Sequence, residues 1–169
     1  MSISIHQASV PAFVRGLNVL SALLTKGEEH VAASGGVPDM LLGARLAEDM
    51  LPLTAQIQRA SDASKFTVAR LCGIEAPKFE DNEASFQQLR ERIAQTIAFL
   101  ESVPEEQFAG AEKRDVTLTY GAFSQHFTGL SYLQTFALPN FYFHVTTAYG
   151  ILRAQGVKIG KLDFLGPFN

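Results

Sequence analysis

The chain contains a single cysteine, Cys72, among its 169 residues. A lone thiol cannot form an internal disulfide, and no Cys-x-x-Cys pair is present to bind a metal or carry out redox chemistry. We expect Cys72 to be a small buried residue near the end of a helix. The first residues, MSISIHQASVP, lack the basic start and the apolar run of a signal peptide. These absences predict a cytoplasmic protein.

Charged side chains are also scarce, at 18% of the chain, with a net charge of −3. The 14 lysines and arginines are scattered, whereas a nucleic-acid surface needs them clustered. Nucleic acid is therefore not an expected partner. A hydrophobic content of 47% is typical of globular proteins rather than disordered ones. The length fits one domain, so we expect a single domain over residues 1–169.

Residues 116–152 contain no Asp, Glu, Lys or Arg at all. Such a stretch has to be tested as a membrane span, which needs about 20 mostly apolar residues. Polar residues from Gln125 to His144 interrupt the stretch repeatedly. We therefore expect no membrane segment here.

The first helix is predicted from Ser9 to about Ala33, with Ser9 as the N-cap and Pro11 in the first turn. Apolar residues then recur at helical spacing and predict a buried stripe. The members of this stripe are Phe13, Leu17, Leu20, Leu24 and Val31. Gly35 and Gly36 end the helix.

The second helix is predicted over residues 38–71, with a bend or break near Met50 because Pro52 removes a backbone hydrogen bond. Beyond the bend, the predicted buried face consists of Leu53, Ile57, Ala60, Ser64, Val68 and Leu71. An acidic, proline-containing loop follows. Residues 85–103, SFQQLRERIAQTIAFLESV, then give the clearest helical pattern, with a narrow apolar stripe and charges opposite.

The period changes after Val116, where apolar residues alternate with threonines up to Tyr120, and Gly121 follows. This pattern predicts a short β-hairpin that packs on a larger body. A last helix is expected from Ser131 to Gln155, helical on both sides of Pro139. The predicted fold is all-α: an antiparallel four-helix bundle with a hairpin before the last helix and an irregular C-terminal tail.

The last helix has no charged face, and its apolar residues cover most of its circumference. A helix that is apolar all round is expected to be buried all round. In a four-helix bundle its outward face then has to be covered, and aromatic residues without charge are typical of an interface core. We expect a homodimer formed through this helix. Coverage by the hairpin and the tail within one chain is the alternative.

The segment LPNFYFHVTTAYGILRAQGVKIGKLDFLG, residues 138–166, resembles an uncharacterised bacterial domain-of-unknown-function family within the DinB/YfiT-like superfamily. The similarity also includes FVRGLNVLSALLTKGEEH and residues 45–89, and so nearly the whole chain. The resemblance implies a four-helix bundle, frequently dimeric, with a pocket at one end. In that superfamily three histidines bind a divalent metal, one from the second helix and two spaced four residues apart on the last. Some relatives are thiol-dependent transferases or isomerases of small molecules.

This chain matches the implied metal site at one position. His144 corresponds to the first ligand on the last helix, but Ala148 stands four residues later, and residues 37–73 contain no histidine. Oxygen atoms of Asp49, Gln56 or Asp62 could replace a nitrogen ligand for a hard cation. A divalent metal held by His144 and Asp49 therefore remains an open hypothesis.

The candidate ligand-binding residues at this end pocket are Asp49, Gln56, Tyr142, His144 and Tyr149. Each has a structural alternative. His144 could be a core histidine with one nitrogen hydrogen-bonded, the tyrosines could serve packing, and Asp49 could form a cap or a salt bridge to a lysine of the tail. Asp49 stands just before Pro52 among Leu46, Met50 and Leu51, and a carboxylate beside apolar neighbours needs a partner or a raised pKa.

Two functions follow from these residues. The first is a bundle that binds a small molecule, with or without a divalent metal, in the end pocket. The second is a non-catalytic homodimeric bundle whose metal site is degenerate and whose last helix serves assembly. The sequence does not decide whether the protein is an enzyme, because geometry has to precede any acid or base role.

Overall fold

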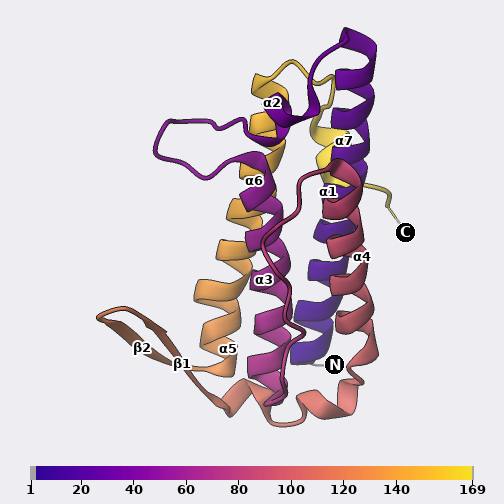
Figure 1. Ribbon diagram of the computed structural model, residues 1–169. Coiled ribbons are helices and arrows are strands. Elements are labelled where there is room, and N and C mark those ends of the chain that lie inside the picture. Colours follow the sequence, from indigo (N-terminus) through magenta and orange to yellow (C-terminus); the bar gives the residue numbers. More distant parts are fainter. Residues whose placement is uncertain (1–2, 169) are drawn as a thin grey trace.

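Four long helices form the body of the protein (Figure 1). The computed structural model describes residues 3–168 of the chain. The long helices are α1 (Ile5–Ser34), α3 (Leu53–Cys72), α4 (Phe86–Ser102) and α6 (Leu138–Ala154). The shorter elements are α2 (Pro38–Leu42), η1 (Glu105–Phe108), η2 (Ala111–Lys113), β1 (Asp115–Tyr120), β2 (Phe123–Thr128), α5 (Gly129–Tyr132), η3 (Leu133–Ala137) and α7 (Lys161–Leu165). The predicted helical bundle with a small hairpin before its last long helix is confirmed.

The chain direction around the bundle is set by one long connection. Helix α3 runs down the bundle in Figure 1, and the segment between Cys72 and Phe86 returns along its length before α4 runs down again. An extended segment of this length reaches more than roughly 40 Å, whereas the 20 residues of α3 span about 30 Å. Helices α3 and α4 are therefore parallel neighbours, while α3 with α6 and α1 with α4 run antiparallel.

The predicted apolar stripes form the core. All five residues of the α1 stripe and all six of the predicted α3 face are buried, as are Phe86, Leu89, Ile93 and Leu100 of α4. Gly16 of α1 lies so close to Phe141 of α6 that a Cβ would stand 2.5 Å from the ring. The glycine lets these two helices approach closely. Cys72 is buried as expected, and burial raises the pKa of its thiol to about 11, against the opposing effect of Arg114.

The predicted N-cap of the first helix is wrong by five residues. Ser4 is the N-cap, because its side chain accepts from the backbone N–H of Gln7 while the Gln7 side chain accepts from the backbone N–H of Ser4. This reciprocal pair is a capping box. Ser9 is buried inside the helix and donates to the carbonyl of Ile5, and Pro11 lies within the helix.

The predicted second helix is interrupted rather than bent. Helix α2 ends at Leu42, a loop occupies residues 43–52, and Pro52 becomes the N-cap of α3. A proline fits at a helix start because no intrahelical partner exists there for the N–H that it lacks. The backbone N–H of Leu53 donates to the carbonyl of Ala44 and closes the loop.

The hairpin pairs Tyr120 with Phe123 across a two-residue turn, as predicted. Its outward face is largely exposed, and Phe127 packs near Tyr132 and Phe136. The last helix is not continuous, since the wider π-turn η3 separates α5 from α6 just before Pro139. Proline cannot donate to the carbonyl four residues earlier, and a local π-turn is one way to accommodate it.

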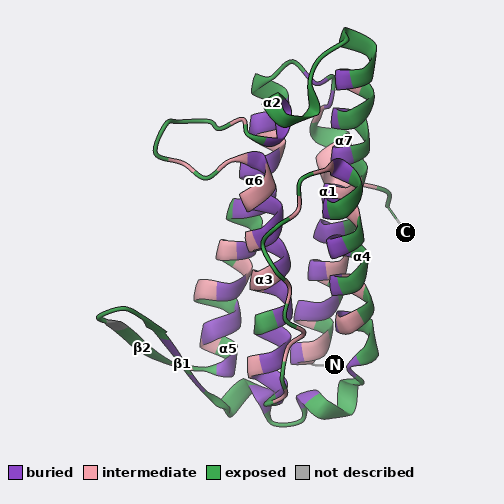
Figure 2. Cartoon of the chain, viewed as in Figure 1, coloured by how far each residue is buried: buried purple, intermediate pink, exposed green. Residues whose placement is uncertain are grey.

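Helix α6 is not covered on all sides within one chain. Phe141, Val145 and Leu152 are buried, but Phe143 is 54% exposed, and Figure 2 shows exposed and intermediate positions along the helix. The tail reaches Tyr149, whose ring lies 5.7 Å from that of Phe164. Neither the tail nor the hairpin shields Phe143. The alternative that the hairpin and the tail cover the outward face of α6 within one chain is therefore wrong.

Helix α1, rather than residues 116–152, has the length and composition of a membrane span. Half of its most apolar 18-residue stretch is buried inside the bundle. Core helices of soluble proteins pass the same test, so this feature is weak evidence for a membrane segment.

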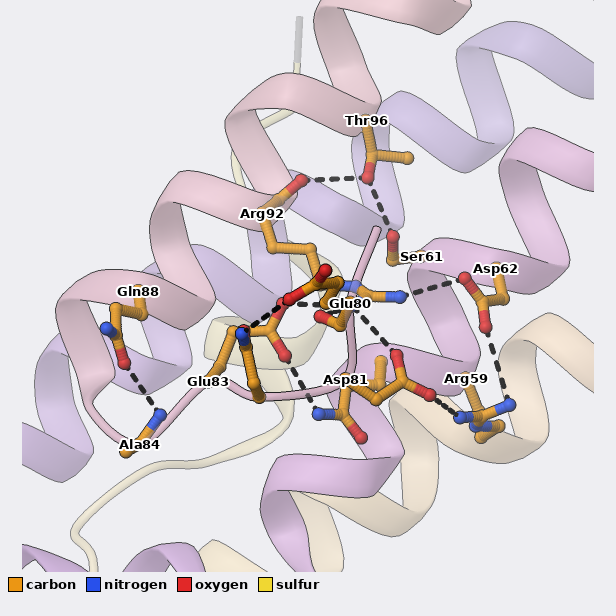
Figure 3. A network of polar contacts seen from close by, with 12 residues as sticks. Arg59, Ser61, Asp62, Glu80, Asp81, Glu83, Ala84, Gln88, Arg92 and Thr96 are labelled. Carbon is orange, nitrogen blue, oxygen red and sulfur yellow. Dashed lines mark hydrogen bonds and ion pairs between the residues drawn. The ribbon is translucent and has the colours of Figure 1, made fainter. Parts of the chain in front are cut away.

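The connection between α3 and α4 is held by a network of ion pairs around the buried side chain of Arg92 (Figure 3). Arg92, on the face of α4 predicted to be solvated, is 3% exposed and donates to Asp62 of α3 and to Asp81 and Glu83 of the connection. Lys65, 1% exposed, binds Asp62 at 2.9 Å. Burial opposes ionisation of Glu83, but hydrogen bonds from Arg92 and Gln58 outweigh it and lower the pKa of this carboxyl.

Arg92→Met is expected to lower the free energy of unfolding by about 3–5 kcal/mol, because it removes the cation that pairs with the Glu83 carboxylate, which is only 10% exposed. Urea unfolding followed by circular dichroism measures the change. Arg90→Met, two residues earlier on α4, is the matched control. Arg90 is 27% exposed and pairs with Glu28, so its loss should cost at most about 1 kcal/mol. Equal losses for the two variants would show that the network contributes no more than a surface ion pair.

Candidate functional site

A cavity of about 410 Å³ lies between α3 and α6, beside the hairpin. Its lining residues come from α3, from the α5–η3–α6 segment and from the end of β1. They are Arg59, Asp62, Ala63, Phe66, Thr67, Arg70, Tyr120, Tyr132, Phe136, Ala137, Asn140 and His144. The π-turn η3 supplies Phe136 and Ala137 to this wall. Such turns within helices occur frequently at functional sites.

His144 is held in the cavity wall by a hydrogen-bond chain with a fixed direction. Gln56 donates its Nε2 to the backbone carbonyl of Leu51 at 3.0 Å, so its Oε1 must face His144. The distance from that Oε1 to His144 Nδ1 is 2.8 Å. Because an amide oxygen only accepts, Nδ1 carries the proton. The neutral imidazole then offers Nε2 as an acceptor, and this atom has no hydrogen-bond partner within residues 3–168.

His144 is 9% exposed, and burial lowers the pKa of its imidazole from 6.5 to about 4, with a further lowering by the positive charge of Arg59. The ring is therefore neutral at pH 7. A neutral ring with a protonated Nδ1 can accept a hydrogen bond from a ligand at Nε2.

The structure brings together two of the five predicted ligand-binding residues, Gln56 and His144. Asp49 is exposed on the 43–52 loop and makes no side-chain hydrogen bond or ion pair to the described residues. The loop contributes the carbonyl of Leu51 to the site instead. Tyr142 and Tyr149 face α1 and α7, where Tyr142 lies near Arg15 and burial raises the pKa of its phenol. The expectation that these side chains share one end pocket is not met, because α6 directs the tyrosines and His144 to different neighbours.

Sequence reasoning missed Arg59, Arg70 and Tyr132. Arg59, Ala63, Phe66 and Arg70 follow one another at spacings of four, three and four residues, which places them on one face of α3. Two arginines on the same helix face as an alanine and a phenylalanine are the sequence feature that could have indicated this site.

A second cavity, of about 430 Å³, lies between α1 and the C-terminal tail. Its charged groups are already engaged, since Arg15 donates to the carbonyls of Leu165 and Pro167 and Lys26 pairs with Asp163. The α3–α6 cavity is the better candidate because it contains an acceptor and a cation with unused capacity.

Comparison with known proteins identifies the family. A family model described as a domain of unknown function, DUF1993, matches residues 5–165. The chain belongs to this family. The resemblance to an uncharacterised DinB-like family is thereby confirmed.

A solved structure described as a DinB family member protein from Shewanella denitrificans is similar to this member of DUF1993. The two share 38% sequence identity with a TM-score of 0.90, over 97% of this chain and 93% of the other. A search of curated proteins gives no match. Family and fold are thus shown, and no reaction comes with them.

The residues of the cavity do not fit the divalent metal that the DinB resemblance implies. No group of three His, Cys, Asp or Glu residues that could hold a metal occurs in the described part of the chain. The oxygen of Gln56 is occupied by His144, and Asp62 is surrounded by Arg59, Lys65 and Arg92. Asp49 is exposed on the 43–52 loop and does not line the cavity. No chemical step is assigned to a metal.

Acidification should destabilise the protein partly through His144. The folded-state pKa of about 4 lies below the unfolded value of 6.5, so the unfolded chain binds more protons between these values and stability falls as the pH falls. Urea unfolding at pH 7.5 and pH 5.0 should show a larger loss for the wild-type protein than for His144→Gln.

The other histidines contribute equally to the pH dependence of stability in the wild-type protein and in His144→Gln, so the difference between the two reports on His144 alone. Nitrogen-15 NMR should also show His144 as neutral with the proton on Nδ1 at pH 6. An imidazole that gains its second proton near pH 6.5 would contradict this assignment.

Proposed function

We propose that this protein binds a small organic molecule in the α3–α6 cavity and that His144 Nε2 accepts a hydrogen bond from it. The supporting observation is the fixed, neutral imidazole in the cavity wall, with Nδ1 held by Gln56 and no described partner for Nε2. Because Nδ1 is already held, the ring does not have to reorient before a ligand donor bonds to Nε2.

The dimensions and chemistry of the cavity support a binding role. Its volume of about 410 Å³ lies within the range of about 300–1,000 Å³ that is usual for small-molecule sites. Apolar side chains such as Ala63, Phe66 and Phe136 stand beside a few polar groups. This combination gives both burial of an apolar ligand surface and orientation of its polar atoms.

Binding is favoured over acid–base catalysis by the pKa of His144. A general base is most effective when its pKa lies near the working pH. A pKa of about 4 makes the imidazole a weak base at pH 7, although it remains a good hydrogen-bond acceptor. We therefore assign His144 to ligand orientation.

Filling the cavity should abolish binding of a neutral fluorescent probe, N-phenyl-1-naphthylamine. Ala63→Trp puts a large side chain into the cavity wall and is expected to weaken probe binding at least tenfold. Fluorescence titration with excitation beyond the absorption of tryptophan measures the affinity.

Ala94→Trp is the matched control, because Ala94 is exposed on α4 away from the cavity. Its affinity for the probe should equal that of the wild-type protein. Unchanged binding by a folded Ala63→Trp variant, or no saturable binding by the wild type, would contradict the proposed site.

A homodimer formed through α6 is a second candidate role, in assembly rather than ligand binding. Phe143 is 54% exposed on a helix without charge before Arg153. Gly150 lies about two turns further along this helix, and the side chain of Leu46, which is 46% exposed, packs beside it. Phe143, Thr146 and Gly150 share one side of the helix. A large exposed aromatic in an uncharged surface is typical of an interface.

Phe143→Glu is expected to weaken such a dimer at least tenfold, because it puts a charge into an apolar contact. Light scattering coupled to size-exclusion chromatography, over a range of protein concentrations, measures the dissociation constant. Leu162→Glu on α7, where Leu162 is 74% exposed, should leave the dimer intact. A wild-type protein that stays monomeric at every concentration would refute this assembly.

A further inference from the structure

Arg70, in the last turn of α3, carries a positive charge in the cavity wall and has no carboxylate partner among the described residues. Its guanidinium lies 5.5 Å from the centre of the Phe66 ring and 5.9 Å from that of Tyr132. The ion pairs formed within residues 3–168 do not include it. A cation between aromatic rings is stabilised, but most of its hydrogen-bonding capacity remains free.

The contact between Arg70 and Tyr132 has a fixed direction. Thr67 Oγ1 donates to the carbonyl of Ala63 at 2.6 Å, since that oxygen can only accept. The Tyr132 hydroxyl, 3.2 Å from Thr67 Oγ1, must then donate to Thr67 and accept from Arg70 Nη1 at 3.1 Å. This chain uses one of the five N–H donors of Arg70. The hydroxyl of Tyr132 has no proton left for a ligand.

The other charges at the cavity compensate one another. Arg59, which lies nearer to His144, pairs with Asp62 and Asp81. Its network contains three cations and three carboxylates. These are Arg59, Lys65 and Arg92, and Asp62, Asp81 and Glu83. The charge that the cavity offers to a ligand is therefore the single positive charge of Arg70.

The acceptor and the cation lie toward different ends of an elongated site. His144 is hydrogen-bonded to Gln56 of α3, and Arg70 lies 14 residues after Gln56 on the same helix. This separation corresponds to a helix rise of about 20 Å, and the long side chains reduce the distance between the two polar groups. Between them, Ala63, Phe66 and Phe136 form apolar wall. A ligand that uses the whole site needs an apolar body with an acidic group at the Arg70 end.

We propose that the ligand of this cavity is an amphipathic organic anion, with its acidic group on Arg70 and its apolar body against Phe66 and Phe136. This inference rests on the proposed binding function and adds the chemical class of the ligand. A charge-assisted hydrogen bond to an arginine is stronger than one between neutral groups, so the anion and its neutral analogue should differ clearly in affinity.

Two dyes with the same aromatic body test the proposal. 8-Anilino-1-naphthalenesulfonate carries a sulfonate, and N-phenyl-1-naphthylamine is its neutral counterpart. Arg70→Gln is expected to weaken binding of the sulfonate dye at least tenfold and binding of the neutral dye less than twofold. Arg70→Lys, which keeps the charge, should restore part of the sulfonate affinity.

Arg153→Gln removes the same charge from an exposed position on α6 outside the cavity and should change neither affinity. The wild-type protein should also lose affinity for the sulfonate dye, but not for the neutral dye, as sodium chloride is raised. That comparison needs no variant, so it stands even where Arg70→Gln fails to fold.

The outcomes separate this proposal from the binding function itself. Neutral-dye binding that is blocked by Ala63→Trp, together with sulfonate binding that is absent or insensitive to both Arg70→Gln and salt, would overturn the anion proposal and keep the site. Sulfonate binding that survives Ala63→Trp would place that dye elsewhere on the surface and also count against the proposal. Loss of saturable binding for both dyes in the wild type would refute the site as a whole.

Discussion

The buried guanidinium of Arg92 is the constraint on which the arrangement of α3 and α4 depends. Parallel neighbours in a bundle need a connection as long as the helix, and such a segment would be loose without attachment points. Arg92 supplies them by donating to Asp81, Glu83 and the carbonyl of Glu80 while it also binds Asp62 of α3. A buried charge is tolerated only when it is paired and hydrogen-bonded. The requirement to satisfy Arg92 therefore holds the connection against both helices.

The same network determines what remains available at the cavity. Asp62 lines the cavity, but Arg92, Lys65 and Arg59 surround its carboxylate. An acid so fully compensated does not attract a metal cation, and it does not neutralise Arg70. Helix α3 thus has three sides, which face the core, the connection and the cavity. Ion pairs on the side that faces the connection determine which charge remains on the side that faces the cavity.

Periodicity predicted the parts of the fold that depend on burial against other helices. The stripe from Phe13 to Val31 and the α3 face from Leu53 to Leu71 are buried because spacing of three and four residues places them on one side of a helix. Arg92 could not be placed in this way. Its position on the polar side of α4 predicted exposure, and only the path of the connection over it makes the side chain buried.

The candidate site, like the fold, could be predicted only in part from the sequence. The sequence predicts His144 and Gln56 for the site, and these residues are in contact. It also predicts Asp49 because of its carboxylate, whereas the loop contributes the backbone carbonyl of Leu51. Backbone groups are present at every residue, so a sequence cannot indicate which of them a fold will use. The capping box of Ser4 and Gln7, in contrast, has a sequence signature, which is a serine followed three residues later by a glutamine.

Both ends of the cavity follow one rule. At one end, the Leu51 carbonyl fixes Gln56, which fixes the proton of His144 on Nδ1. At the other end, the Ala63 carbonyl fixes the hydroxyl of Thr67, which fixes that of Tyr132 and so directs Arg70. Because a carbonyl can only accept, each chain has one direction of donation. The cavity is left with an acceptor at His144 and donors at Arg70 before any ligand arrives, and this preorganisation lowers the cost of ordering the site on binding.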